Sequence, residues 1–399
     1  MLSALATGPS QLTGLLTSAD IQSTATVLRA LGVEIPMIGN DPVVVNGVGA
    51  AGLRLPTGDL DAGNSGTTAR LMSGILAARP YRSRLIGDAS LSKRPMGRVS
   101  KPLSEMGAKF EFVNGDGLPM TIIGSALRGI TWRSESASAQ VKSALLLAGF
   151  TAGVPVEVHE PALSRDHTER MMRGRGVDVR SEGAVATLVP GATMRALDVQ
   201  VPGDPSSAAF FAALAALATG GEIELPGVCA NPGRTGVFRV LDRMGARIGW
   251  EDMSDEGGEP VATLIAAPRT LKGVTIAPDE VPSLIDELPM LACVAARASG
   301  ETRVTGAGEL RVKESDRIAL VVKNLRAVGV DAEELPDGFV VRGSDHPLSG
   351  RIETEGDHRI AMAFGVLSAA TGGMIDIDDR DCVGVSYPDF WNDLGQATV

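Results

Sequence analysis

The chain has 399 residues, 44% of them hydrophobic, which is enough for about two domains of ordinary size. Its formal net charge of −11 argues against nucleic acid or an anionic membrane surface as a partner. No apolar run reaches the roughly 18 residues of a transmembrane helix, and we expect a cytoplasmic protein. The cysteines lack metal-ligand spacing and are predicted to be buried reduced thiols: Cys229, Cys293 and Cys382.

A helical stretch that ends in glycine and is followed by an alternating strand recurs along the chain. The pattern predicts a helix closed by a left-handed glycine, then a strand. Successive copies are 66 to 84 residues apart, at Gly32, Gly107, Gly176, Gly245, Gly329 and Gly395. Six copies predict two similar α/β domains of three repeats each, residues 1–200 and 201–399, with the active site in a cleft between them.

The first candidate site in chain order is the helix start Asn64-Ser65-Gly66-Thr67-Thr68. Gly66 falls in the first turn of an apolar helix, where glycine lowers helix propensity. It also lets a ligand approach bare backbone N–H groups, which attract anions. We therefore favour an anion ligand at this helix start.

The next candidate is the cationic run Gly-Asp-Ala-Ser-Leu-Ser-Lys-Arg-Pro-Met-Gly at residues 87–97. Pro95 restricts the backbone of Arg94, and arginine can bind a phosphate or carboxylate with two parallel hydrogen bonds. By itself the run is equally compatible with a solvated basic turn and with a loop that binds an anion.

Three later helices also begin with polar residues, in the runs 134–140, 204–207 and 356–359. For the second run, Asp204 as N-cap with proline at the first helical position favours plain capping. Arg359 opens the last helix and is compatible with either a solvated arginine or a ligand contact.

Two acidic segments complete the candidates. Asp286 and Glu287 stand at the start of an apolar helix, where carboxylates are common stabilisers. In the run 311–317, Lys313 and Arg317 would be one helical turn apart, with Glu314 between them. Glu314 could donate a proton only if burial counteracts the neighbouring cations.

Six motifs of the chain, in this order, closely resemble the 5-enolpyruvylshikimate-3-phosphate (EPSP) synthase family, the 3-phosphoshikimate 1-carboxyvinyltransferases. The resemblance covers essentially the whole chain. The motifs are Asn64–Arg70, Gly87–Gly97, Ser138–Ser143, Ser164–Arg170, Arg311–Arg317 and Asp357–Met362.

The resemblance implies a fold and an activity. The fold is an inside-out α/β barrel of two domains, each with three βαβαββ repeats. The activity is transfer of the enolpyruvyl group of phosphoenolpyruvate to the 5-hydroxyl of shikimate 3-phosphate, with release of phosphate, on the route to chorismate and aromatic amino acids. The family implies no metal or organic cofactor, and a monomer. Glyphosate competes for the phosphoenolpyruvate site in this family, so an inhibitable pocket is expected beside Gly66.

The resemblance also implies roles for individual residues. Asp286 corresponds to the group that handles the 5-hydroxyl proton, and Glu314 to the acid that protonates the methylene carbon, with Lys313 as the third catalytic residue. The implied phosphoenolpyruvate site is Gly66, Arg94, Gln140, Arg317 and Arg359. The implied shikimate 3-phosphate site is Ser138, Ala139, Gln140, Arg165, Asp286 and Lys313.

The chain departs from the family pattern in two places. Members carry a strand and a Gly-Asp-Lys-Ser-x-Ser-x-Arg-Ala motif upstream of the point that matches Met1. The chain as written shortens the first helix and leaves a C-terminal sheet edge unpaired. We expect the true start to lie upstream, because every other motif of the family is intact. The alternative is a catalytically silent copy that binds anions. Val385 stands where many members of the family have a lysine. Some branches of the family lack that lysine, so we interpret Val385 as a difference between branches.

A second alternative is the sister enzyme that transfers enolpyruvyl to UDP-N-acetylglucosamine. That branch usually carries a cysteine in the loop that matches residues 87–97, where this chain has Ala89. The sequence therefore favours the shikimate branch.

Overall fold

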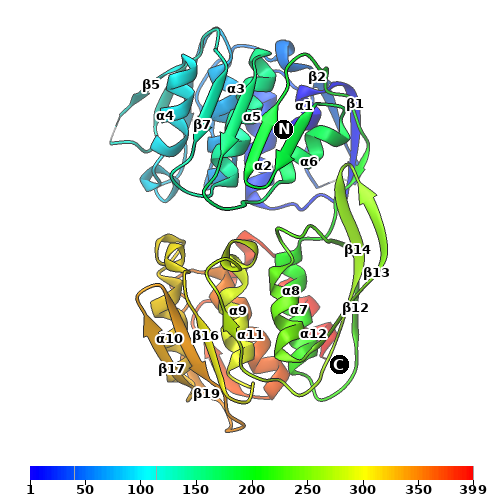
Figure 1. Cartoon of the computed structure of the whole chain (residues 1–399), viewed down its shortest axis with the longest axis vertical. Helices are drawn as coiled ribbons and strands as arrows, with labels where there is room; N and C mark the ends of the chain where they lie inside the picture. Colours follow the sequence, from blue (N-terminus) through cyan, green and yellow to red (C-terminus); the bar gives the residue numbers. More distant parts are fainter. Residues whose placement is uncertain (40, 114, 399) are drawn as a thin grey trace. The chain divides into compact units, whose positions relative to one another are not determined.

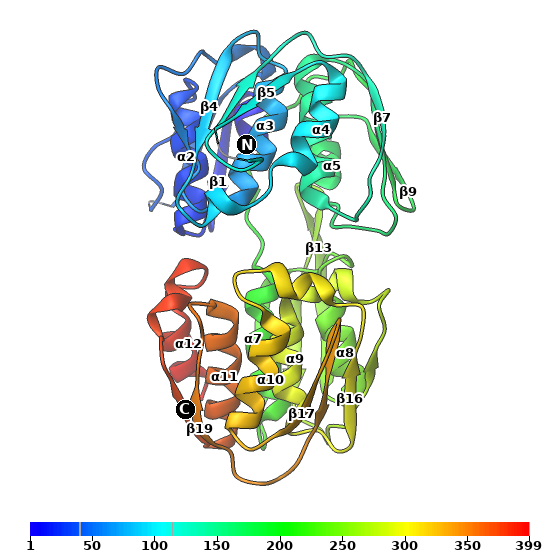
Figure 2. The ribbon, with the colours of Figure 1, turned by 90° about the vertical axis from the view of Figure 1, so that its left-hand side faces the viewer.

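The computed structural model describes residues 1–39, 41–113 and 115–398, which form two compact units. We call them unit 1 (Met1–Val201 with Glu256–Glu259) and unit 2 (Pro202–Asp255 with Pro260–Val399). In each unit, helices lie side by side and small sheets cover them on the outside (Figure 1, Figure 2). This mixed α/β arrangement is the inside-out architecture that the family resemblance implies.

Unit 1 contains three small sheets, with strand orders β11-β1-β2, β3-β4-β6-β5 and β7-β8-β10-β9. Helices α3 and α5 pack against each other inside them. The helices are α1 (Leu2–Leu5), α2 (Ala19–Ala30), α3 (Gly66–Ala77), α4 (Gly97–Met106), α5 (Ala139–Ala152) and α6 (His167–Gly174). The strands are β1 (Thr7–Thr13), β2 (Val43–Val48), β3 (Leu60–Asp61), β4 (Arg82–Ile86), β5 (Lys109–Phe112), β6 (Met120–Ile123), β7 (Ile130–Arg133), β8 (Val156–His159), β9 (Val179–Glu182), β10 (Val185–Leu188) and β11 (Val199–Gln200).

Unit 2 has sheets β12-β14-β13, β15-β16-β18-β17 and β19-β20 around α7, α9 and α11. Its helices are α7 (Pro205–Leu217), α8 (Gly236–Met244), α9 (Leu288–Ala295), α10 (Arg317–Ala327), α11 (His358–Thr371) and α12 (Phe390–Ala397), with 3-10 turns η4 (Ile285–Glu287) and η5 (Gly308–Val312). Its strands are β12 (Ile223–Cys229), β13 (Arg247–Glu256), β14 (Glu259–Ala267), β15 (Thr275–Ile276), β16 (Glu301–Val304), β17 (Asp331–Leu335), β18 (Gly338–Arg342), β19 (Ser349–Ile352) and β20 (Met374–Ile377).

The repeat found in the sequence is visible in the sheet topology. Each four-stranded sheet begins with a parallel pair and continues with two antiparallel pairs. In the second of these sheets, for example, Ile130 of β7 lies opposite Val156 of β8. A parallel pair needs a crossover connection, and the helix between its strands becomes the inner layer.

The predicted helix-closing glycines are confirmed at five positions and wrong at the sixth. Gly32, Gly107, Gly176, Gly245 and Gly329 all have φ between 84° and 120°. Gly395 instead lies inside α12. Glycine permits the left-handed conformation without imposing it, and the buried Phe390 and Leu394 anchor α12 as a continuous helix.

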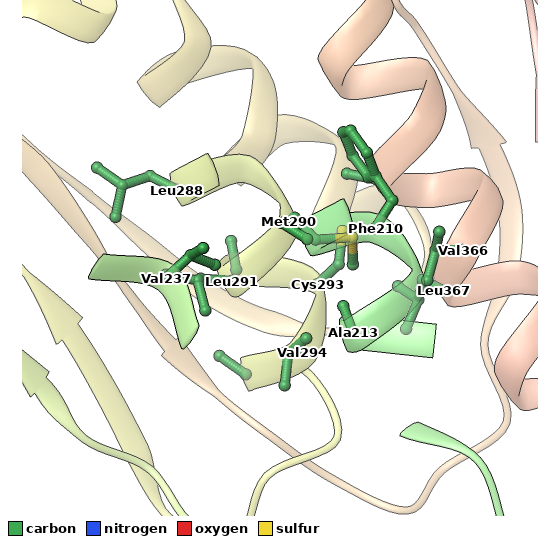
Figure 3. Packing of buried hydrophobic residues seen from close by; sticks show 14 of the residues in the cluster. Phe210, Ala213, Val237, Leu288, Met290, Leu291, Cys293, Val294, Val366 and Leu367 are labelled. Atoms are coloured by element: carbon green, nitrogen blue, oxygen red, sulfur yellow. The ribbon is translucent and has the colours of Figure 1, made fainter. Parts of the chain in front are cut away.

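Each unit has its own hydrophobic core. In unit 2, α7 and α9 are apolar on all sides and therefore run through the interior. Figure 3 shows Phe210, Cys293 and Leu367 packed together there. Burial raises the pKa of the Cys293 thiol well above its ordinary value, so this cysteine is a packing residue. None of the three cysteines, all of which lie in the described residues, forms a disulfide. Cys382 is only partly buried, which corrects the expectation for that residue.

None of the helices in the described parts of the chain is long and apolar enough to cross a bilayer. The candidate site residues lie where helices begin, at the ends of the packed cores.

Candidate active site

The first cluster of unit 1 surrounds the N-terminus of α3. Ser65 caps this helix, its Oγ accepting a hydrogen bond from the Thr68 N–H at 3.2 Å. A Cβ on Gly66 would lie 3.2 Å from Arg70 Nη1 and 3.5 Å from Arg94 Nη1. Two guanidinium groups therefore border the first turn of α3, whose N–H groups and dipole also favour an anion.

The cationic loop is tied to this helix start. Asp88 accepts hydrogen bonds from the Leu91 N–H at 2.7 Å and from Asn64 Nδ2 at 2.6 Å. Arg94 Nη2 donates to Asn64 Oδ1 at 3.1 Å. Partial burial alone would raise the pKa of Asp88, but these hydrogen bonds and Arg94 hold it below its usual value. The loop is thus tied to the start of α3, although Asp88, Lys93 and Pro95 remain exposed.

Gln140 joins the starts of α3 and α5. Its Oε1 accepts from Arg70 Nη1 at 2.7 Å, and its Nε2 donates to Thr67 Oγ1 at 3.0 Å. Burial, and then the charges of Arg94 and Arg98, lower the pKa of Arg70. An arginine remains charged in a protein, so this crowding of cations marks a site for an anion.

The sequence interpretation missed Arg70 as a site residue, although Arg70 ends the Asn64–Arg70 motif. Its spacing from Gly66 could have indicated its role. Arg70 follows Gly66 by four residues, so on a helix the two share a face.

The candidate shikimate 3-phosphate residues of unit 1 lie in two neighbouring segments. Ser138 is the N-cap of α5, with Ala139 and Gln140 in its first turn. Arg165 lies in the loop between β8 and α6. The carboxylate of Glu160 contacts both segments, through the Ser138 N–H at 2.8 Å and Ser164 Oγ at 2.7 Å.

In unit 2 the candidate residues converge on Arg317, the first residue of α10, which is 1% exposed. Its Nε donates to Asp357 Oδ2 at 2.8 Å and its Nη2 to Glu314 Oε2 at 2.6 Å. Its Nη1 contacts Asp286 Oδ1 at 3.4 Å. Three segments far apart in the sequence therefore meet at one guanidinium group.

Lys313 also contacts Asp286, with Nζ 3.2 Å from Oδ1. The expected helical spacing of Lys313 and Arg317 is wrong, because Lys313 has extended backbone and α10 begins only at Arg317. Asp316 caps α10 and sets this start, accepting from the Ala319 N–H at 3.1 Å. The burial that the sequence argument required for Glu314 is also not present, since its side chain is 39% exposed.

Arg359 is the second residue of α11, whose cap is Asp357. Its Nη1 donates to the Asp286 carbonyl oxygen at 3.1 Å and to Glu287 Oε1 at 3.2 Å. Asp357 is fully buried and also accepts from Ser315 Oγ at 2.9 Å. Arg359 is therefore ordered by contacts at the start of α9 rather than solvated.

We expect His358, between these groups, to make unit 2 less stable at acidic pH. Burial, and then the charges of Arg359 and Arg317, lower its pKa to about 4, although Asp357 and Glu314 oppose this. On acidification, His358 of the unfolded chain binds a proton near pH 6.5, whereas His358 of the folded chain binds one only near pH 4. The free energy of unfolding should therefore fall by up to about 1.4 kcal/mol per pH unit between pH 6.5 and 4.

Urea unfolding of wild type and His358→Gln at pH 7 and pH 4.5 measures this effect. The variant should lose less stability on acidification, whereas His346→Gln, at an exposed position, should behave as wild type. An unchanged acid response in His358→Gln would contradict the assignment.

Comparison with known proteins shows the family of the chain. The family model of EPSP synthase (3-phosphoshikimate 1-carboxyvinyltransferase) matches residues 1–394. The chain belongs to the EPSP synthase family. A 3-phosphoshikimate 1-carboxyvinyltransferase of Sulfurihydrogenibium sp. (strain YO3AOP1) is 47% identical over 404 residues, covering 100% of this chain and 93% of the relative. That of Aquifex aeolicus (strain VF5) is 47% identical over 400 residues, with coverages of 99% and 92%.

Solved structures show the same likeness. An EPSP synthase from Acinetobacter baumannii has a TM-score of 0.92 and 43% identity, covering 100% of this chain and 92% of that one. The enolpyruvyl transferase NikO from Streptomyces tendae, at 20% identity and a TM-score of 0.73, shares the fold. The chain is thus an enzyme of the EPSP synthase family with the inside-out α/β fold.

Proposed function

We propose that this chain transfers the enolpyruvyl group of phosphoenolpyruvate to the 5-hydroxyl of shikimate 3-phosphate and releases phosphate. The observation that carries the proposal is the convergence of two carboxylates, Asp286 and Glu314, on one buried arginine, Arg317. The reaction needs one group to accept a proton and one to donate it, and also cations that offset two anionic substrates.

We assign the substrate contacts by cluster. The cations and polar groups around α3 and α10 bind phosphoenolpyruvate: Gly66, Arg94, Gln140, Arg317 and Arg359. The residues at the start of α5, in the loop before α6 and beside η4 bind shikimate 3-phosphate: Ser138, Ala139, Gln140, Arg165, Asp286 and Lys313.

The reaction would proceed by addition and elimination. Asp286 accepts the proton of the 5-hydroxyl as the hydroxyl oxygen attacks C2 of phosphoenolpyruvate. Glu314, the acid that the family resemblance implies, protonates the methylene carbon C3; because its side chain is 39% exposed in this structure, the bound substrates must supply the burial that this proton donor needs. The tetrahedral intermediate then loses a proton from C3 and its phosphate, which leaves the enolpyruvyl ether. Lys313 and Arg317 hold Asp286 in place for the first step.

Phosphate release with both substrates tests the proposal. We expect turnover with shikimate 3-phosphate and none with UDP-N-acetylglucosamine. Binding of both substrates without release of phosphate would instead indicate a catalytically silent anion-binding protein.

Arg94→Ala is expected to lose phosphoenolpyruvate binding. A charge-assisted hydrogen bond contributes about 1.5–3 kcal/mol, so the KM for phosphoenolpyruvate should rise roughly 10- to 150-fold. Steady-state kinetics with phosphoenolpyruvate as the varied substrate measures this change. Lys93→Ala is the matched control, since Lys93 is the adjacent cation and is exposed. Near-normal binding in Arg94→Ala would remove the loop from the site.

A further inference from the structure

A buried ion cluster lies behind the start of α5, and the reaction scheme does not use it. Lys142 is 3% exposed, and its Nζ lies 2.9 Å from both Glu160 Oε2 and Glu169 Oε1. Burial alone would lower the pKa of Lys142, but the two carboxylates raise it above its ordinary value. The lysine is therefore charged and compensates the buried Glu160.

Glu160 makes two hydrogen bonds in addition to its ion pair with Lys142. Its Oε1 accepts the Ser138 N–H at 2.8 Å, which fixes the residue that begins α5. Its Oε2 accepts a hydrogen bond from Ser164 Oγ at 2.7 Å. Ser164 directly precedes Arg165. One carboxylate thus spans the two segments to which the shikimate 3-phosphate contacts are assigned.

Glu169 offers an internal comparison. It is as buried as Glu160 and lies at the same distance from Lys142. Its Oε2, however, has no hydrogen-bond partner among the described residues. Burial raises the pKa of Glu169 despite the lysine. Glu169 thus shares the lysine with Glu160 but makes no recorded contact with Ser138 or Ser164.

We propose that Glu160 is a positioning residue, which sets affinity for shikimate 3-phosphate by holding Ser138 and the Ser164–Arg165 segment in one arrangement. The proposal rests on the function proposed above. A carboxylate is needed because three donors converge on it, and both oxygens must accept. In Glu160→Gln one oxygen becomes an NH₂ group, which would face either the Ser138 N–H or the Lys142 ammonium.

The test compares Glu160→Gln with Glu169→Gln in steady-state kinetics. We expect Glu160→Gln to raise the KM for shikimate 3-phosphate about tenfold, with the phosphoenolpyruvate KM and kcat within about twofold of wild type. Glu169→Gln should leave both KM values within twofold. Equal effects of the two variants, or a parallel rise of both KM values, would overturn the proposal, because loss of packing alone predicts that result.

Two further measurements keep the outcome decisive. If Glu160→Gln does not fold, Ser164→Ala removes only the hydroxyl contact and should raise the shikimate 3-phosphate KM about threefold; an unchanged KM would overturn the proposal. Amide hydrogen exchange in residues 134–139 and 161–166 needs no turnover and should speed up in Glu160→Gln alone. Thus wild-type inactivity would refute the proposed function, whereas unchanged exchange would refute the role of Glu160.

Discussion

Arg317→Ala is expected to lower the free energy of unfolding by about 3–5 kcal/mol, because it leaves a buried charge without its partner. Arg317 and Asp357 are 1% and 0% exposed, and their contact at 2.8 Å holds the starts of α10 and α11 together. Burial alone would raise the pKa of Asp357, but Arg317 holds it below its usual value. Without the arginine, that carboxylate stays buried and uncompensated. Urea unfolding at pH 7 measures the loss.

Arg342→Ala is the matched control for this change. Arg342 also contacts several carboxylates, with Nη2 3.0 Å from Glu301 Oε2 and Nη1 3.5 Å from Asp331 Oδ2, but its side chain is 42% exposed. Surface ion pairs contribute about 0–1 kcal/mol, so this variant should remain close to wild type. Equal losses in the two variants would show that burial of Arg317 does not determine its contribution.

Asp286→Asn should lower kcat by about 10²- to 10⁴-fold, the usual contribution of a positioned general base. Asparagine keeps the size of the side chain and an oxygen that can accept from Lys313 and Arg317, but it cannot take up the hydroxyl proton. The variant should therefore fold normally and still bind both substrates. Single-turnover phosphate release, with substrate binding measured separately, distinguishes loss of chemistry from loss of binding.

Asp279→Asn provides the control, since Asp279 is an exposed carboxylate in the segment before η4. It should retain wild-type kcat. If Asp286→Asn kept more than about a tenth of wild-type kcat, Asp286 would not be the group that accepts the proton.

Local features of the fold could be predicted because near neighbours in the sequence decide them. The caps Ser65 and Ser138 each accept a hydrogen bond from an N–H three residues later. Gly107 and Gly245 adopt the backbone that closes a helix. The periodic recurrence of such signals predicted the repeated α/β architecture. Gly395 shows the limit, because packing of the surrounding helix overrode the local signal.

The partners of charged side chains could not be predicted in the same way. Asp204 stands at the N-cap position of α7, but its side chain forms no capping hydrogen bond; its Oδ1 instead accepts from Arg234 Nη2 at 2.7 Å, thirty residues along the chain. Gln140 contacts Arg70 across seventy residues. Capping and turn preferences act over three or four residues, whereas these contacts depend on which helices pack together.

The sequence by itself determined the repeats, the helix starts and the motifs of the EPSP synthase family. Only the tertiary structure decided which of these polar groups meet: Arg70 beside Gly66, Asp286 between Lys313 and Arg317, and Glu160 between two loops. The physical reason is that a buried charge must find a partner, and that partner is whichever group the packing of the apolar helices brings within reach.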